Sequence, residues 1–412
     1  GNNTAIGALA LDAVAAAGQN TAVGYQSLST STASSLTAVG YQALKANTSG
    51  VWNTAIGTQA GFANVTGANL TALGHKAGYS QAGATDDNNT WVGYLSGSAA
   101  NGASAGGNTG VGSNSLSSLT TGIYNTALGY RSLNSQTTLS ESVAVGAYAG
   151  TTTTARVTAI GGYALQNNST GIDNTAVGYG AMTANTSGLS NTAVGVTTGN
   201  AQAGATDDNN TWVGYQAGKL ANGSGSGRNT AIGSNTLDAL TTGASNTSLG
   251  YLSSSAIVSG NYTTGIGSYA LLVNTASGNS AFGYSALGSN ITGLYNTAVG
   301  YLAGNAQAGV TDDGNTWVGY NAGLVANGGA GNNTSTGYNT LAALTTGQEN
   351  IGIGSNSGLN VVTGSKNVSV GSSSLLFNTS SSNTAIGYAA GRANVTGQYL
   401  TAVGYQAGNA QA

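Results

Sequence analysis

Three pairs of neighbouring aspartates are the residues of this chain best suited to hold a metal ion. They lie in nearly identical runs, Gln-Ala-Gly-Ala-Thr-Asp-Asp-Asn-Asn-Thr at 81–90 and 202–211, with two changes at 307–316. Carboxylate and amide oxygens are the hard ligands that Ca²⁺ prefers. The runs lack the spaced acidic loop of an EF-hand and the nonapeptide of calcium-binding β-rolls. A solvated turn is therefore the favoured interpretation of these runs. The alternative is a calcium site, and calcium is the only cofactor that the sequence suggests. Its candidate ligands are Asp86, Asp87, Asp207, Asp208, Asp312 and Asp313.

The other titratable residues do not form a catalytic set. His75 is the single histidine and stands where many repeats have Tyr, with no acidic residue or Cys beside it. Glu141 lies between Ser140 and Ser142 without a base partner. Acid–base catalysis needs positioned groups that exchange a proton with the substrate and with each other. We therefore expect no catalytic residue and no enzyme.

The composition removes several functional classes. Only 5% of the 412 residues are charged, so the chain has no basic stripe that would bind nucleic acid. It has no Cys, which excludes disulfides, zinc–thiolate sites and a thiol nucleophile. No apolar run reaches the ~18 residues of a membrane-spanning helix, and no membrane insertion is expected in this segment. The absence of Pro suits a chain whose backbone N–H groups are mostly paired in ladders.

A short phrase, Asn-Thr-Ala-(Val/Ile/Leu)-Gly-Tyr, recurs along the whole chain and must position any functional residue. Its Gly occurs in 24 copies from Gly7 to Gly404, at a mean spacing of about 17.3 residues. A unit this short cannot enclose a core and must stack on its neighbours. The repeat predicts an all-β parallel β-solenoid, or β-roll, of about 24 coils, as a single continuous array over 1–412. Both ends fall inside repeats, so we expect a fragment of a longer chain.

Each repeat contains one strand followed by turns. Thr, Val and Tyr alternate with Ala and Gly over 20–28, which is the period of a strand. The aliphatic residue before the Gly is mostly β-branched and suits a pleated surface. We predict that it forms the core ladder, represented by Val23, Val39, Ile56, Val177, Val299 and Val403. A second ladder is predicted five residues later, where Leu28 and Leu44 stand and other coils have Gly.

The Gly of the phrase and the Tyr that follows it in 13 copies each allow two interpretations. The Gly either lets two backbones approach closely or holds a bulge. The Tyr residues form either an aromatic binding stripe or a stacked ladder or chain–chain contact, and the structural interpretation is favoured.

Trp replaces Ala in three copies of the phrase, at Trp91, Trp212 and Trp317. The repeats are longer only beside these residues, which predicts longer coils around 79–111, 200–232 and 305–336. Packing of the indole over a widened coil is the favoured interpretation, and a ledge that faces a ligand is the alternative. The last residues, 408–412, match the start of this longer run, so the full-length protein is expected to continue with Gly-x-Thr-Asp-Asp-x-Asn-Thr-Trp.

The phrase at 20–28, 174–182 and 296–304 resembles the head repeats of YadA-like trimeric autotransporter adhesins. It is more closely similar to the Asn-Thr-Ala-Ile-Gly-Tyr-Gln-Ala-Leu arrays of phage tail-fibre and related bacterial fibre proteins. The resemblance covers the whole chain and implies a left-handed β-roll that trimerises side by side. It also implies that Val23-type residues line each core and that small Ala22-type residues let chains pack closely. The repeat is longer than in the adhesins, and 1–412 contains no coiled-coil stalk, membrane anchor or chaperone domain.

Together these features predict the structural and adhesive shaft of an extracellular, cell-surface or virion fibre. Its expected partners are copies of itself, as a homotrimer or filament, and a cell-surface receptor or glycan. Many weak sites on one rod give avidity without a deep pocket. The alternative is an ice-binding or other lattice-binding solenoid that uses the ladder formed by Thr4, Thr21, Thr37, Thr54, Thr71 and their equivalents.

Overall fold

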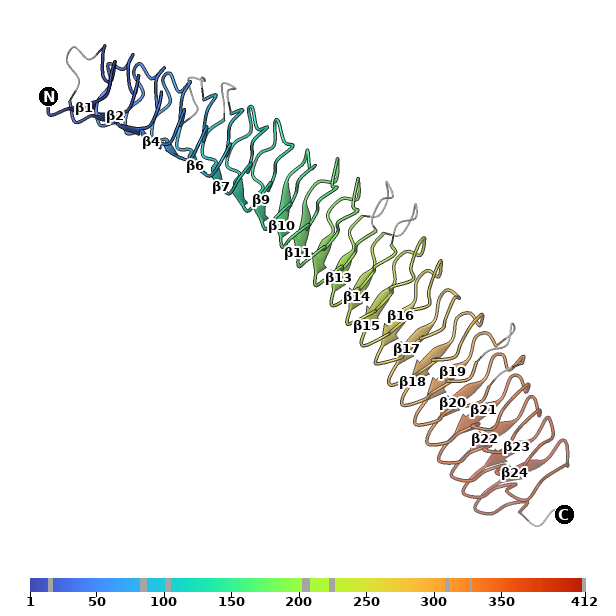
Figure 1. The fold of residues 1–412 in the computed structure, drawn as a ribbon. Coiled ribbons are helices and arrows are strands. Elements are labelled where there is room, and N and C mark those ends of the chain that lie inside the picture. Colours follow the sequence, from blue (N-terminus) through green and yellow to red (C-terminus); the bar gives the residue numbers. More distant parts are fainter. Residues whose placement is uncertain are drawn as a thin grey trace. The chain divides into compact units, whose positions relative to one another are not determined.

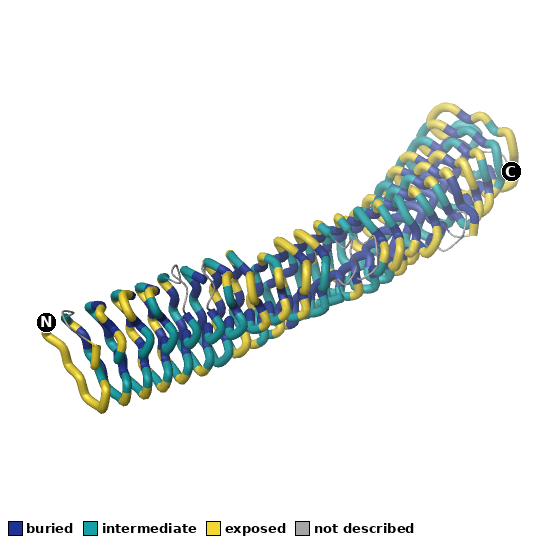
Figure 2. The backbone as a smooth tube through the Cα atoms, turned by 90° about the horizontal axis from the view of Figure 1, so that it is seen from above, coloured by how far each residue is buried: buried dark blue, intermediate teal, exposed yellow. Residues whose placement is uncertain are grey.

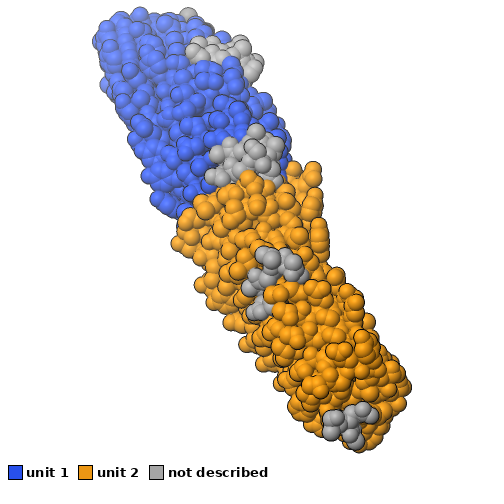
Figure 3. Space-filling view, turned by 90° about the vertical axis from the view of Figure 1, so that its right-hand side faces the viewer, with its two compact units in different colours: residues 1–208 blue, residues 209–412 orange. Residues whose placement is uncertain are grey.

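The computed structural model describes residues 1–13, 18–81, 87–100, 105–201, 208–221, 227–307, 312–326 and 328–409. The chain forms two compact units, Gly1–Asp208 and Asn209–Ala412, and each is considered by itself (Figure 3). The described residues contain no helix, and thus none that is long and apolar enough to cross a membrane.

The described residues of the first unit form twelve short strands, one for each copy of the repeat in this unit (Figure 1). They are β1 (Thr4–Ile6), β2 (Thr21–Val23), β3 (Thr37–Val39), β4 (Thr54–Ile56), β5 (Thr71–Leu73), β6 (Thr90–Val92), β7 (Thr109–Val111), β8 (Thr126–Leu128), β9 (Val143–Val145), β10 (Val157–Ile160), β11 (Asn174–Val177) and β12 (Thr192–Val194).

The second unit repeats this arrangement with another twelve strands. They are β13 (Thr211–Val213), β14 (Thr230–Ile232), β15 (Thr247–Leu249), β16 (Thr264–Ile266), β17 (Ser280–Phe282), β18 (Thr297–Val299), β19 (Thr316–Val318), β20 (Thr334–Thr336), β21 (Ile351–Ile353), β22 (Val368–Val370), β23 (Thr384–Ile386) and β24 (Thr401–Val403).

Within each unit every strand pairs in parallel with the next one along the chain. The register places equivalent residues of the repeat opposite each other, as Thr21 opposite Thr37 in the first unit and Thr384 opposite Thr401 in the second. Strands that pair in parallel need a crossover connection, and here each crossover is the rest of one coil. The predicted all-β parallel solenoid with a repeat of about 17 residues is therefore confirmed.

From β2 to β24 the core contains the strand residue at the position of Ala22, and the predicted core ladder is wrong. Ala22, Ala38 and their equivalents are fully buried. The residues predicted to line the core point outward instead: Val23, Val39 and Val177 are half-buried, and Ile56, Val299 and Val403 are 40%, 40% and 66% exposed. Figure 2 shows this alternation of buried and accessible positions along the coils.

The narrow interior of the coil explains this inversion. Successive side chains of a strand point to opposite faces, so Thr and Val share one face and Ala takes the other. The interior is already occupied by larger residues from the turns, since the predicted second ladder is confirmed as buried at Leu28, Leu44, Leu116, Leu133, Leu165, Leu237, Leu271, Leu287, Leu341 and Leu375. A strand methyl group fills the remaining space.

A ladder of buried asparagines joins consecutive coils. The Asn that precedes most of the strands after β1 is almost completely buried. The Oδ1 atom of Asn108 accepts a hydrogen bond from the backbone N–H of Asn125 at 2.9 Å, and its Nδ2 atom donates to the carbonyl oxygen of Gly122 at 2.9 Å. The same contacts recur in the second unit, for example from Asn229 to Asn246. Because buried backbone groups need partners, this side chain replaces ladder bonds just before the strand begins.

The Gly after each strand turns the chain where two coils nearly touch. Gly93 has φ +131°, and a Cβ atom built there would lie 2.6 Å from the carbonyl oxygen of Gly112 in the next coil. This contact favours close backbone approach over a bulge as the role of the Gly. Both the positive φ and the lack of space disfavour any side chain.

Candidate functional site

The three tryptophans predicted as ligand-facing alternatives are buried, so that alternative is wrong. Trp91, Trp212 and Trp317 are 0% exposed and occupy the interior in place of the usual strand alanine. The same coils have Gly97, Gly218 and Gly323 at the position of the buried Leu, and a Cβ atom at any of these glycines would collide with the indole. Trp plus Gly thus replaces Ala plus Leu, which confirms the favoured packing interpretation.

These wide coils also bury polar atoms without partners. Among the described residues, the Nε1 atoms of the three tryptophans make no hydrogen bond, and neither do the amide atoms of Gln81 and Gln307. Paired strands are farther apart in the sequence beside a Trp strand than elsewhere. Thr71 lies opposite Thr90, and Thr90 lies opposite Thr109, so each step is 19 residues long. Much of the predicted longer coils, at 82–86, 101–104, 202–207, 222–226, 308–311 and 327, lies outside the described residues.

The described aspartates of the three pairs bind backbone groups of neighbouring coils. The Oδ1 atoms of Asp87, Asp208 and Asp313 each accept a hydrogen bond at 2.7 Å, from the N–H groups of Ala68, Leu189 and Leu294. Asp86 and Asp207 lie outside the described residues. Within the described part of the chain, no group of three or more His, Cys, Asp or Glu residues could hold a metal ion.

Asp312 is the most deeply buried of the described aspartates in these pairs. It is fully buried, and its Oδ1 atom accepts hydrogen bonds from the N–H groups of Gly329 at 2.7 Å and Ala330 at 2.8 Å. Its Oδ2 atom accepts from Gly328 at 3.3 Å. The carboxylate therefore stabilises the following turn through its charge-assisted bonds.

His75 and Glu141 each belong to a ladder of surface side chains. The imidazole of His75 stacks on Tyr94 with ring centroids 5.4 Å apart. Glu141 forms an exposed ion pair with Arg156 at 3.2 Å, and Arg156 also contacts Asp173 at 2.6 Å. The hydrogen bonds that Arg156 donates to Asp173 and, to a smaller extent, to Glu141 raise the pKa of Arg156. Such exposed pairs contribute little to stability.

Exposed tyrosines stack from coil to coil at the corner after the strand. In the second unit Tyr284, Tyr301, Tyr320 and Tyr338 stack in succession, with centroids 5.2 Å apart. In the first unit Tyr148 and Tyr163 belong to a similar series, in which the rings of Tyr163 and Tyr179 meet at 77° with centroids 5.6 Å apart. These contacts support the stacked ladder as the structural role of tyrosine.

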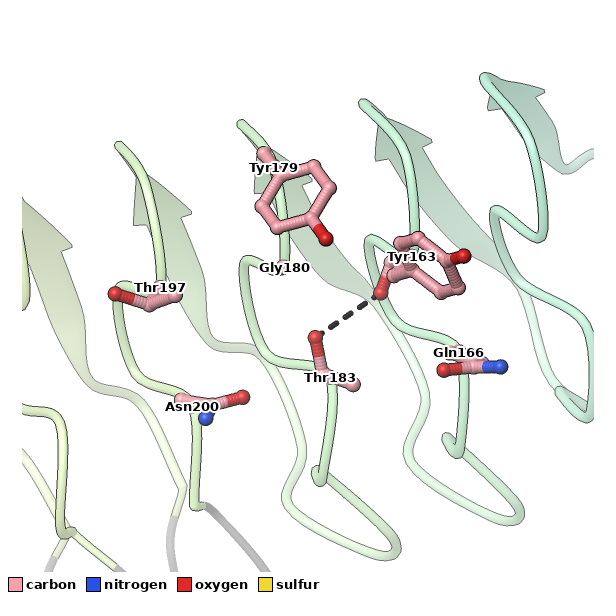
Figure 4. A pocket seen from close by; sticks show the side chains of 7 residues that line it. All are labelled: Tyr163, Gln166, Tyr179, Gly180, Thr183, Thr197 and Asn200. Carbon is pink, nitrogen blue, oxygen red and sulfur yellow. Dashed lines mark hydrogen bonds between the residues drawn. The ribbon is translucent and has the colours of Figure 1, made fainter.

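The tyrosine series of the first unit ends at a pocket of about 250 Å³ (Figure 4). It lies over the turns that follow β10, β11 and β12 and is lined by Tyr163, Gln166, Tyr179, Gly180, Thr183, Thr197 and Asn200. Gly180 creates the space, because Gln26, Gln42 and Gln59 occupy its position in other coils and form a side-chain ladder there.

The polar atoms of the pocket differ in how they are engaged. Thr183 donates a hydrogen bond to the carbonyl oxygen of Tyr163 at 3.1 Å. The Oδ1 atom of Asn200 is buried without a partner among the described residues, and Figure 4 shows it directed toward Thr183. The hydroxyl of Thr197 also has no described partner but points away from the other lining side chains. The lining has no carboxylate, imidazole or cationic side chain, and its phenol, hydroxyl and amide groups can hydrogen-bond a molecule.

The pocket residues were missed in the sequence, although a signal for them exists. Gly180 replaces Gln and Val196 replaces the corner Tyr in consecutive coils, and these changes stand out only when the repeats are aligned on the strand. Comparison with known proteins adds no further information, because no family model, no curated protein and no solved structure matches the chain.

The outward side of the strands is the second candidate surface. We name the two residues that flank the position of the buried Ala (Ala22 and its equivalents) in each strand, such as Thr175 and Val177, the strand face. In both units these residues are half-buried or exposed, and none of the 24 strands contains a charged residue. Each unit therefore carries a row of Thr beside a row of Val, Ile or Leu.

Proposed function

We propose that this protein is the structural and adhesive shaft of an extracellular or virion fibre and that it assembles side by side with copies of itself. The observation that carries the proposal is the strand face. It presents aliphatic side chains to solvent in coil after coil, as at Ile56 in the first unit and Ile232 and Val299 in the second, each 40% exposed. Large exposed apolar surfaces mark interaction sites in soluble proteins.

Copies of the same chain are the partner that this surface suits. The strand face has no charge to select an oppositely charged molecule, and its rows repeat at the spacing of the coils. A second copy presents rows at the same spacing, so the aliphatic side chains of one chain can pack between those of another along many coils. The number of three chains follows the resemblance to YadA-like heads. The implied role of Ala22-type residues at this contact is wrong, because those residues are buried inside the coil.

The test places charges on the strand face. In the triple variant Val39→Lys, Val177→Lys and Val299→Lys, three cations would enter the proposed contact without solvent. Light scattering of the unmodified protein should give three times 39.9 kDa, about 120 kDa, and the variant should give the single-chain mass. An unmodified protein with a mass of 39.9 kDa would overturn the assembly.

A charge-matched control separates this contact from a general effect of added lysine. Val258, Val273 and Val395 are 45%, 37% and 49% exposed but lie in the turns between strands. Changing these three residues to Lys should leave the mass at about 120 kDa. Equal dissociation of both triple variants would show that the strand face is not the contact.

An ice-binding or lattice-binding solenoid is the second candidate, and one observation favours it. Thr and the aliphatic residue share the outward face, so the Thr ladder is accessible rather than buried beside a core residue. This function needs the strand face free, whereas assembly covers it. A monomeric mass together with retarded ice growth would favour the lattice-binding function, and retarded growth should be lost in the strand-face variant.

A further inference from the structure

We propose that the pocket over β10–β12 binds one neutral pyranose ring of a glycan, held between the rings of Tyr163 and Tyr179 and the amide of Asn200. This inference rests on the adhesive part of the proposed function and adds to it a site and a ligand class. It is independent of the strand face and of the number of chains, since every lining residue belongs to the turns of one chain.

The size of the pocket sets the size of the ligand. Its volume of about 250 Å³ lies below the ~300–1,000 Å³ of sites for drug-sized molecules. One sugar ring with its hydroxyl groups suits this volume, and the rest of a glycan would extend into solvent past Tyr179, which is 59% exposed.

The two tyrosine rings supply an apolar wall with a corner. They contact each other at 77° with centroids 5.6 Å apart, so a ligand in the corner that they form contacts one ring by its face and the other by its edge. The C–H groups on one side of a pyranose ring pack well against an aromatic face, while the tyrosine hydroxyls stay available as hydrogen-bond partners. An anion is disfavoured because Lys and Arg are absent from the lining residues.

The amide of Asn200 distinguishes a sugar from other uncharged or cationic guests. Its Oδ1 atom is buried without a described partner, and a buried acceptor left unpaired is costly. A sugar hydroxyl can donate to it. A quaternary ammonium group also suits aromatic walls, but it has no hydrogen to donate to this oxygen.

Gly180 provides a blocking variant that the fold already accommodates. Its φ is +64°, and Gln26 and Gln42 hold the equivalent position with φ values of 55° and 57°. The backbone N–H of Gly180 bonds to the carbonyl of Gly162 as that of Gln42 bonds to Tyr25, at 2.9 Å in both cases. Gly180→Gln therefore introduces a residue that other coils already hold at this position, and its side chain fills the pocket. Ser285→Gln makes the same addition at an equivalent position of the second unit, where φ is 51°, and serves as the control.

The experiment measures binding of the methyl glycosides of glucose, galactose and N-acetylglucosamine by saturation-transfer NMR and calorimetry. We expect at least one to bind with a dissociation constant on the order of 1 mM, as suits a single small ring. Gly180→Gln and Asn200→Ala should each weaken binding at least tenfold, and Ser285→Gln should not change it.

Three results would overturn the sugar site: no glycoside bound in the millimolar range, undiminished binding to both Gly180→Gln and Asn200→Ala, or choline bound more tightly than every glycoside. Asn200→Ala keeps the test decisive if Gly180→Gln lowers the melting temperature. No sugar binding together with a mass of about 120 kDa would reject the sugar site and leave the proposed assembly in place. Sugar binding together with a single-chain mass would support the sugar site and reject the assembly.

Discussion

At the scale of single residues, the coil depends on polar side chains that are buried and paired. The asparagine that precedes most strands satisfies two backbone groups of the next coil, as Asn296 does by accepting from the N–H of Asn315 at 2.8 Å and donating to the carbonyl of Asp312 at 2.7 Å. Gln307 is buried to the same degree, yet both atoms of its amide lack partners within the described part of the chain. The two residues should therefore respond oppositely to an apolar replacement.

Gln307→Leu is expected to stabilise the second unit by about 1–2 kcal/mol, because an unpaired buried amide costs about 1–3 kcal/mol and Leu has a similar volume. Asn296→Leu is the matched control and should destabilise by about 2–4 kcal/mol, since it leaves backbone groups unpaired. Urea unfolding of both variants measures the difference. Destabilisation by Gln307→Leu to the same extent as the control would contradict the unpaired state of Gln307.

The raised pKa of Asp238 predicts that the stability of the second unit depends on pH. Burial raises its pKa above the usual 3.8, and nearby backbone N–H groups and Lys219 only partly oppose this. A carboxyl whose folded-state pKa is raised contributes most below its unfolded pKa, and this stability is lost as the pH rises through the folded pKa. Asp238→Asn should therefore melt at a higher temperature than the unmodified protein at pH 7. The difference should vanish near pH 3, and a difference independent of pH would exclude this cause.

At the scale of the coil, the glycine after the strand fixes how closely neighbouring coils stack. A side chain at Gly93 would meet the carbonyl of Gly112 at 2.6 Å and would also require a strained φ of +131°. At Gly162, by contrast, the nearest atom to a built Cβ is 3.5 Å away, and Ala147 already occupies this place in the preceding coil.

Gly93→Ala is expected to lower the free energy of unfolding by about 2–6 kcal/mol, from backbone strain of about 1–3 kcal/mol together with overpacking of about 1–3 kcal/mol. Gly162→Ala should change it by less than about 0.5 kcal/mol. Thermal and urea unfolding of the two variants provide the comparison. A loss at Gly162 equal to that at Gly93 would refute the steric account.

The sequence predicted the strands, their period and their stacking, because these depend on spacing alone. It did not predict which side of the strand is inside, since Thr-Ala-Val alternates equally well in either orientation. Assigning the larger residue to the core failed at Val23 because the turns had already supplied Leu28. The pairing of Asn108 with Asn125 and the pocket at Gly180 were also missed. Both depend on contacts between coils that one repeat does not contain.

At the scale of the whole molecule, the inversion of the strand changes which residues meet other molecules. A solenoid with Val inside would present a small and featureless alanine surface. With Ala inside, the chain presents Thr and aliphatic rows that differ little from coil to coil. The mass of the unmodified protein, compared with that of the strand-face variant, is thus the measurement that bears most directly on how the protein works, since assembly covers this surface and lattice binding needs it free.

The pairing of Trp with Gly has a consequence for how the chain finds its register during folding. Coils with the same phrase can stack in a wrong order at little cost, because Thr would still lie over Thr. At Trp317 this tolerance ends, since Gly304 of the preceding coil leaves space for the indole. A chain that skipped this coil would bring Leu287 to the indole instead, and the side chain would collide. We therefore expect each tryptophan to disfavour a wrong stacking order of the coils in a chain whose repeats are otherwise nearly interchangeable.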